Sequence, residues 1–341
     1  MIGTVGDMTN RNREIRLASR PSGPARTENF ALAETEIPEP GAGQILVRNT
    51  WMSVDPFMRG LMDAESDFFL PQYEIGQPLY GGAVGEVVAS RADGVPVGAT
   101  VSHFLGWREY AVVDAAEATV IDTGLAPANA YLGPLGTTGL TAWAALTDVA
   151  PVREGDVVFV SAAAGAVGSI AGQIARRLGA AKVIGSAGGP DKAKRLVHDF
   201  GFDAALDYKR GDLAGQLAAA APDGIDLYVD NVGGDHLEAA IDAMRTGGRA
   251  ALIGSISGYE ADVPGPRNLE RIVLRQLTLR GVQVSAYFDR FPEFIAQAAG
   301  WLADGSLRSA ETVVEGIEQA PAAFLGVLSG ANTGKMLVRL P

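Results

Sequence analysis

The chain has 341 residues, enough for two domains, and its 28 basic and 40 acidic residues give a formal net charge of −12. This charge argues against nucleic acid or an anionic membrane surface as a partner, so we expect neither. Because cysteine is absent, disulfides, thiolate nucleophiles and cysteine-containing zinc sites are excluded. The histidines, His103, His198 and His236, lack the spacing of metal ligands, so we expect no bound metal.

The N-terminal segment is polar and mixed in charge, without the apolar stretch of a signal peptide. Elsewhere no run approaches the roughly 20 apolar residues that a membrane-spanning helix needs. We therefore expect a cytoplasmic protein that does not enter a membrane.

Short strand-like runs separated by turn residues dominate residues 44–113 and predict a small β-rich domain. Strand-like and helix-like runs then alternate over residues 138–305, which is typical of a doubly wound parallel sheet and gives an α/β fold. The strand-like tail, residues 335–341, is expected to return to the first domain, which comprises residues 1–137 and 306–341. The strands of the parallel sheet are expected over residues 157–162, 182–188, 204–208, 225–232, 248–255 and 277–284.

The most informative stretch is residues 157–179, where a continuous apolar run leads through small residues into an amphipathic helix. Between strand and helix lie Ala163, Gly165 and Gly168, the GxGxxG pattern with alanine in its first position. Such glycines allow a tight turn, the approach of a pyrophosphate and close helix packing. Similar small-residue runs occur in cores without a ligand, but the flanking strand and helix favour a phosphate-binding turn.

The end of the second strand indicates which cofactor binds. Ser186 stands about 20 residues past the glycines, where an NAD-binding chain carries an acid for the ribose 2′-hydroxyl. The missing carboxylate and the nearby Lys192 favour NADPH over NADH. A solvated Lys192 at a helix start is the alternative, and Asp191 beside it would weaken the attraction.

Several separated motifs lie along nearly the whole chain. They are SVDPFMRG (53–60), LGTTGLTAW (135–143), AAAGAVG (162–168), GSAGGPDK (185–192), GFDAALDYK (201–209), YVDNVGG (228–234), IGSISGY (253–259) and NTGKMLV (332–338). Together they resemble the zinc-independent branch of the medium-chain dehydrogenase/reductase superfamily, in the group of leukotriene B4 dehydrogenases, prostaglandin reductases, alkenal double-bond reductases and bacterial curcumin-reductase-like enzymes. The resemblance implies a GroES-like β-rich catalytic domain, a Rossmann domain over residues 138–305, NADPH as cofactor, and reduction of the carbon–carbon double bond of α,β-unsaturated ketones or aldehydes.

The resemblance also assigns cofactor contacts. It places Asn231 on the adenine or ribose side, where a role as a turn former is the alternative, and Asn332 at the nicotinamide end. The remaining contacts are Gly165, Ala166, Val167 and Gly168 at the pyrophosphate, and Lys192 and Tyr208 at the 2′-phosphate, with Ser186 and Gly189 beside them.

By the same resemblance Tyr259 lies near the substrate carbonyl; without it, Tyr259 would be interpreted as a packing residue. Phe57 stands where many relatives have tyrosine, so we expect it to form an apolar wall with Met52 against a small hydrophobic enone or enal. Nearby Asp55 and Arg59 are expected to pair structurally. Two alternatives remain open: a quinone reductase of the same superfamily, and a non-catalytic NADPH-binding protein.

Residues 277–284 are expected to form the last strand of the parallel sheet. An open, apolar sheet edge of this kind invites pairing with its copy, so we expect a homodimer.

Overall fold

In a computed structural model, which describes residues 11–65, 68 and 70–341, the chain divides into two compact units. The first comprises residues 1–123, 313–325 and 337–341, and the second comprises residues 124–312 and 326–336. These limits differ from the predicted ones, because residues 124–137, 306–312 and 326–336 belong to the second unit. Residues 1–10 of the predicted first domain lie outside the described residues.

The first unit is built on a seven-stranded sheet in the order β14-β15-β3-β4-β5-β7, with β6 paired to β3. The predicted strand-like runs form β3 to β6, and alternate residues such as Ile45 and Val47 point into its core. The tail returns to this sheet as expected, because Leu337 of β15 lies opposite Ser53 of β3 in an antiparallel pair. The strands are β3 (Gln44–Ser53), β4 (Ala83–Ser90), β5 (Thr100–His103), β6 (Tyr110–Asp114), β7 (Thr119–Val120), β14 (Glu311–Glu315) and β15 (Lys335–Arg339), and the helices are α1 (Met58–Leu61) and α9 (Ala320–Leu328).

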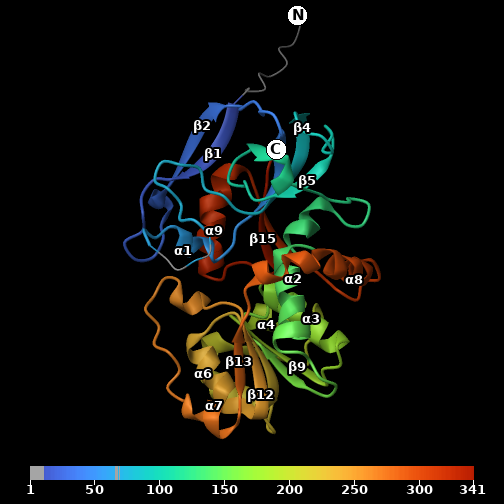
Figure 1. The fold of residues 1–341 in the computed structure, drawn as a ribbon. Coiled ribbons are helices and arrows are strands. Elements are labelled where there is room, and N and C mark those ends of the chain that lie inside the picture. The colour runs from blue at the N-terminus through green and yellow to red at the C-terminus, as the bar shows by residue number, and fades with distance from the viewer. Residues whose placement is uncertain (1–10, 66–67, 69) are drawn as a thin grey trace, which may run out of the picture. The chain divides into compact units, whose positions relative to one another are not determined.

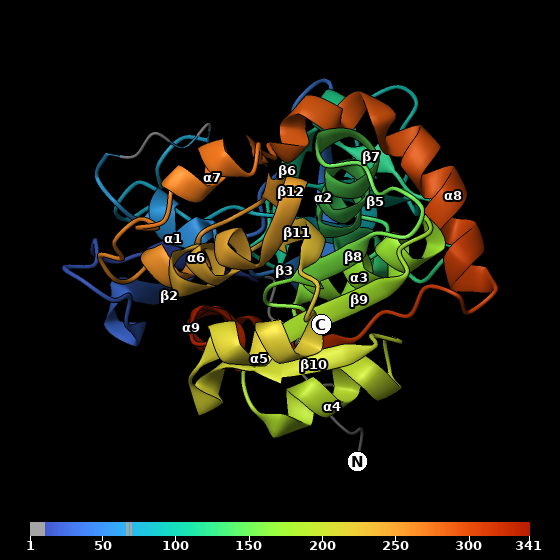
Figure 2. The ribbon, with the colours of Figure 1, turned by 90° about the horizontal axis from the view of Figure 1, so that it is seen from below.

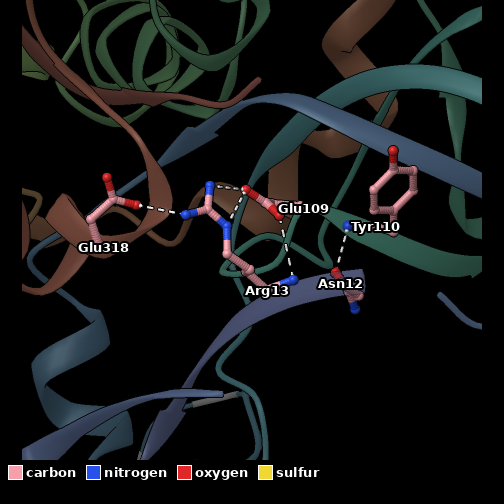
Figure 3. Close-up of polar contacts among 5 residues, drawn as sticks. All are labelled: Asn12, Arg13, Glu109, Tyr110 and Glu318. Carbon is pink, nitrogen blue, oxygen red and sulfur yellow. Dashed lines mark hydrogen bonds and ion pairs between the residues drawn. The ribbon is translucent and has the colours of Figure 1, made fainter. Parts of the chain in front are cut away.

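A separate antiparallel pair, β1 (Arg11–Leu17) and β2 (Phe30–Glu36), was not expected from the sequence. Side chains of β1 bind it to the start of β6, as Figure 3 shows. The Arg13 guanidinium donates from Nε to Oε1 of Glu109 at 2.9 Å, and the Tyr110 N–H donates to Oδ1 of Asn12 at 2.9 Å. The hydrogen bond to Glu109 raises the pKa of Arg13 above its usual value.

The second unit contains a six-stranded parallel sheet in the order β10-β9-β8-β11-β12-β13 (Figures 1 and 2), and all six predicted strands are confirmed. The chain winds outward from β8 in one direction and from β11 in the other, so the strand order reverses between these neighbours. In such sheets ligands bind at the carboxyl ends of the strands, at this reversal. The strands are β8 (Val157–Val160), β9 (Lys182–Ala187), β10 (Ala204–Asp207), β11 (Ile225–Asp230), β12 (Met244–Leu252) and β13 (Thr278–Gly281).

Helices of the second unit bury the apolar side chains of this sheet. Phe159 of β8 stacks on Tyr228 of β11, with ring centroids 5.1 Å apart, in a cluster that includes Ala240 and Ile241 of α6. In the described part of the chain, no helix is both long and apolar enough to cross a membrane. The helices are α2 (Thr137–Ala144), α3 (Ala166–Arg177), α4 (Pro190–His198), α5 (Leu213–Ala220), α6 (Gly234–Ala243), α7 (Glu270–Leu274) and α8 (Phe291–Ala303).

Candidate functional site

The glycine loop between β8 and α3 has the geometry of an anion-binding turn. Gly165 is the N-cap of α3 and supplies no side-chain cap, so the N–H groups of Ala166, Val167 and Gly168 in the first turn have no intrahelical acceptor. A Cβ on Gly168 would lie 2.5 Å from the carbonyl oxygen of Ala162, so only glycine lets the helix pack this closely. Ala162 also carries the left-handed backbone of the loop, with φ at +45°. Because Ala162 supplies the left-handed conformation of this turn, position 163 does not require glycine and can be alanine.

The C-terminal segment 326–336 crosses this loop. Gly334 forms a parallel bridge with Gly165, and its N–H donates to the Ala164 carbonyl at 2.7 Å. Asn332 lies just before it and donates from Nδ2 to the Gly334 carbonyl at 2.7 Å. The sequence predicted Asn332 at the nicotinamide end, whereas its backbone carbonyl here accepts a hydrogen bond from Lys192 at 2.6 Å.

Replacing Gly334 with alanine is expected to destabilise the second unit by about 2–4 kcal/mol, the sum of a left-handed backbone and a steric overlap. Its φ is +68°, and an added Cβ would lie 1.8 Å from the Ala310 carbonyl oxygen. Gly330→Ala is the matched control, because its φ is +69° but nothing lies within 4 Å of the added atom. Thermal unfolding measures both variants. Equal losses of stability would show that the close approach of Gly334 to Ala310 has no energetic weight.

Two lysines lie together at the carboxyl ends of β9 and β10. Lys192, in the first turn of α4, donates to the carbonyls of Gly330 and Asn332 at 2.6 Å each. Burial, and secondarily the charge of Lys209, lower the pKa of Lys192 below its usual value. Among the described residues neither lysine forms an ion pair with a carboxylate. Two cations that repel each other without an acidic partner are suited to bind an added anion.

The turn after β9 leaves room for the groups that would surround this anion. A Cβ on Gly188 would lie 2.9 Å from the Tyr208 hydroxyl oxygen and 3.1 Å from Cε of Lys209, so glycine is needed for their approach. Gly189 has a φ of +99° and donates its N–H to Oδ1 of Asp207 at 2.8 Å. The structure thus brings Gly189, Lys192 and Tyr208 together as predicted and adds Lys209. In the sequence, the only indication of a role for Lys209 is its position next to Tyr208.

Ser186 occupies the predicted place near the carboxyl end of β9, but its hydroxyl is buried and bonded. Its Oγ lies 2.9 Å from Nε2 of His236, and both residues are almost fully buried. Burial lowers the pKa of His236, against the raising effect of Asp230 and Asp235. The Ser186 hydroxyl therefore faces the protein interior. The sequence, in contrast, predicts that Ser186 lies beside the 2′-phosphate.

The loop after β11 joins the ends of the two central strands. Asn231 donates from Nδ2 to the Ser161 carbonyl at 2.8 Å, so its amide stabilises this turn, and its Oδ1 still accepts. The buried Asp230 accepts the N–H groups of Val232 and Gly233 at 2.9 Å each. Sequence reasoning did not single out this carboxylate, which orders the loop at the reversal of strand order.

Tyr259 follows a short helical turn after β12 and lies on the same end of the sheet. The Ile256 N–H of this turn donates to the Asn231 carbonyl at 3.4 Å. Burial raises the pKa of the Tyr259 hydroxyl above the usual value of 10.0, although the backbone of Ser255 acts to lower it. Tyr259 is therefore protonated at neutral pH and keeps its O–H hydrogen for donation.

In the first unit Phe57 is partly exposed at the start of α1 and stacks on Phe68, with centroids 5.5 Å apart and planes 3° from parallel. Met52 of β3 has no exposed surface, so it is a core residue and not the predicted pocket wall. Arg59, which was expected to pair with Asp55, donates to Asp63, four positions further along the chain, at 2.8 Å.

The other histidines have no place in this site. His103 is buried, its Nε2 lies 2.8 Å from Oδ1 of Asn49, and desolvation lowers its pKa to about 3, so it is a neutral core residue. His198 is exposed on α4. Across residues 11–65, 68 and 70–341, no three histidine, aspartate or glutamate side chains gather as metal ligands would.

Two family descriptions match the chain, "N-terminal domain of oxidoreductase" over residues 13–121 and "Zinc-binding dehydrogenase" over residues 166–300. YfmJ of Bacillus subtilis is 42% identical over 98% of this chain and 99% of its own. The NADPH-dependent curcumin reductase of Escherichia coli is 36% identical over 98% of this chain and 99% of its own. The NADP(+)-dependent 2-alkenal reductase of Nicotiana tabacum is 36% identical over 89% of each chain.

The fold is similar to that of CurA from Vibrio vulnificus, solved in complex with NADPH, with a TM-score of 0.90 and 38% identity over 96% of this chain and 99% of that one. Sequence and fold agree over nearly the whole length. The chain therefore belongs to the medium-chain dehydrogenase/reductase family, in the zinc-independent group of curcumin, prostaglandin and alkenal reductases.

Proposed function

We propose that this protein is an NADPH-dependent reductase of the carbon–carbon double bond of α,β-unsaturated ketones and aldehydes. The observation that carries the cofactor assignment is the pair of Lys192 and Lys209 beside Tyr208, next to the end of β9, where Ser186 stands in place of the carboxylate that would bind a ribose hydroxyl. The substrate class rests on the relatives, because curcumin and 2-alkenals both contain a double bond conjugated to a carbonyl.

The residues of the second unit fit a dinucleotide. The free N–H groups of Ala166, Val167 and Gly168 would hold its pyrophosphate, and Lys192, Lys209 and Tyr208 its 2′-phosphate. Asn231 keeps Oδ1 as an acceptor for the ribose side, and Asn332 contributes the carbonyl that orients Lys192. Ser186 and Gly189 shape the turn beneath the phosphate site.

The reduced nicotinamide, when bound, supplies a hydride to the β-carbon of the enone. Negative charge then develops on the substrate carbonyl oxygen, where a hydrogen-bond donor lowers the barrier. We assign this donor to Tyr259, whose hydroxyl is protonated and keeps its own hydrogen. The exposed side of the stacked Phe57 and Phe68 offers an apolar surface to a hydrophobic substrate.

The test of this function is the oxidation of NADPH in the presence of a panel of alkenals, alkenones, aryl enones and quinones. We expect turnover with the conjugated aldehydes and ketones, and a saturated product in which the carbonyl is retained. Turnover of quinones alone would identify a quinone reductase instead. Binding of NADPH without turnover of any acceptor would indicate a non-catalytic protein.

Activity is expected to be independent of metal ions. A conjugated acceptor is already electrophilic at its β-carbon, and the chain has no cysteine for a zinc site. Dialysis against a strong chelator should leave the rate unchanged, and elemental analysis should find no stoichiometric zinc. One equivalent of zinc that is lost together with activity would contradict this prediction.

We also infer that the protein is a cytoplasmic homodimer. The strand β13 is last in the order of its sheet, and α7, which precedes it, exposes 79% of Val273 and 72% of Leu274. Exposed apolar side chains next to an open strand edge favour association with a second copy. Because the chain has no cysteine, its fold needs no disulfide and is compatible with a reducing compartment such as the cytoplasm.

Light scattering at micromolar concentration is expected to give twice the chain mass, and Leu274→Asp to shift it toward the monomer. Leu125→Asp is the control, because Leu125 is also exposed, at 52%, but lies outside α7 and β13. A parent protein that is monomeric at these concentrations would remove the inference.

A further inference from the structure

His236 occupies a position that the proposed reaction does not use. It lies in the first turn of α6 and is 7% exposed, with its Nε2 bonded to the Ser186 hydroxyl at 2.9 Å. Its ring also meets the ring of Tyr208, with centroids 5.3 Å apart and planes at 73°. One buried side chain therefore connects the ends of β9 and β10 with the start of α6.

We propose that His236 is a positioning residue that orients Tyr208 toward the 2′-phosphate and thereby helps to select NADPH over NADH. The proposal rests on the proposed function, because it assigns a further residue to the same cofactor site. His236 does not touch the phosphate itself.

Tyr208 needs such support because it is held weakly by its own surroundings. Its side chain is at the surface, 40% exposed, and follows directly after the last residue of β10. Its hydroxyl lies over Gly188, where the missing side chain provides space but no contact that would fix the ring. The edge-to-face contact with His236 therefore limits the directions that the Tyr208 ring can adopt.

His236 can fix Tyr208 because its own ring is fixed at two points. The hydrogen bond to Ser186 sets the ring orientation, and Ser186, near the carboxyl end of β9, has no exposed surface. The backbone of His236 is held as well, since its N–H donates to the Gly233 carbonyl at 3.1 Å. Gly233 in turn is bound by the buried carboxylate of Asp230 at 2.9 Å.

The charge of His236 plays no part in this role. Burial lowers its pKa, whereas Asp230 and Asp235, the charged groups that act on it, raise the pKa. The neutral ring leaves the positive charge of the phosphate site to Lys192 and Lys209. Its contribution is the orientation of an aromatic hydroxyl, and this should appear in selectivity for the phosphate and not in general nucleotide binding.

The experiment compares two fragments of the cofactor by calorimetry, 2′,5′-ADP, which carries the 2′-phosphate, and 5′-AMP, which lacks it. His236→Ala should weaken the binding of 2′,5′-ADP about three- to tenfold, as expected when the hydrogen bond from Tyr208 to the phosphate is misaligned but not removed, and should leave the binding of 5′-AMP unchanged. His236→Phe keeps an aromatic ring against Tyr208 but loses the hydrogen bond to Ser186, so its affinity for 2′,5′-ADP should decrease less. Ser186→Ala should decrease this affinity as much as His236→Phe does. The double variant of His236→Phe and Ser186→Ala should bind 2′,5′-ADP no more weakly than either single variant.

The control is His198→Ala, which removes an exposed histidine of α4 and should change neither affinity. Thermal unfolding identifies any variant that does not fold, and His236→Phe and Ser186→Ala then decide the question in place of His236→Ala. Equal weakening of both fragments would overturn the proposal, since it would show a general structural role. Unchanged affinity for 2′,5′-ADP in all variants would also overturn it. If the parent protein itself does not bind 2′,5′-ADP more tightly than 5′-AMP, the proposed cofactor NADPH is wrong. That result would count against the proposed function and not only against the role of His236.

Discussion

Replacing Tyr259 with phenylalanine should lower the turnover of an enone by about tenfold to several hundredfold, the range for loss of one donor to a developing oxyanion. Water or a cofactor hydroxyl can take over part of the role, which accounts for the lower end. The NADPH affinity should stay nearly unchanged, because the ring remains and the lost hydrogen bond matters chiefly in the transition state. Single-turnover kinetics under conditions where hydride transfer limits the rate measure the effect.

The pH profile gives a second measure of this residue. Burial raises the pKa of Tyr259 above 10.0, so its donor hydrogen is present throughout the neutral and mildly alkaline range. Between neutral pH and pH 10, the rate of hydride transfer should therefore not decrease through loss of the Tyr259 proton. Tyr110→Phe is a suitable control, because the described contact of Tyr110 is through its backbone N–H in the first unit. If Tyr259→Phe works at the parental rate, Tyr259 is a packing residue and another donor must serve the carbonyl.

Removing the charge of Lys209 is expected to reduce the preference for NADPH over NADH by about ten- to a hundredfold, the value of one charge-assisted hydrogen bond. Lys209→Met keeps the apolar stem beside Gly188 and loses only the cation, so its effect should be confined to NADPH. Lys192→Met should have a similar effect on selectivity and should also lower the melting temperature. The reason is that Lys192 holds the carbonyls of Gly330 and Asn332.

Lys194→Met provides the control, because Lys194 is exposed on the same helix and makes no described contact with the site. Because the pKa of Lys192 is lowered, NADPH affinity should depend on pH. As the pH rises, Lys192 loses its proton, and the affinity should begin to decrease before pH 10.5 is reached. NADH affinity should not change over the same range. Equal use of NADH and NADPH by the parent protein would contradict the assignment of the two lysines.

The parallel sheet could be predicted because its strands are buried on both faces and therefore appear as continuous apolar runs, such as Val157–Val160. The pair of β1 and β2 could not, because its buried positions include Asn12 and Glu14, which break the alternation of apolar and polar residues. Asn12 accepts from the backbone of Tyr110, far along the chain, whereas Glu14 accepts from Arg16 on the same strand. No local pattern shows a partner as distant as Tyr110.

The proposed cofactor site follows from the sequence where short motifs mark it, and the sequence leaves it incomplete where several strand ends meet. The glycine loop, Lys192 and Tyr208 lie in such motifs, so the sequence alone could propose them. Asp230 and His236 act through hydrogen bonds to residues brought near by the sheet, and sequence reasoning found only a scattered histidine and a strand end. The burial of Met52 likewise depends on the strands that pair with β3.

The contact of Gly334 with the glycine loop affects how the protein is made. During synthesis Gly165 emerges 169 residues before Gly334 (334 minus 165), which at about 5–20 residues per second takes roughly 10–30 s. The strands β9 to β13 emerge during this interval, and once Gly281 has emerged the nascent chain has all strands of the parallel sheet but still lacks the segment that crosses the glycine loop. Chains that terminate before residue 326 should therefore fold much of the sheet yet fail to retain the dinucleotide, so retention of the dinucleotide reports on completed translation.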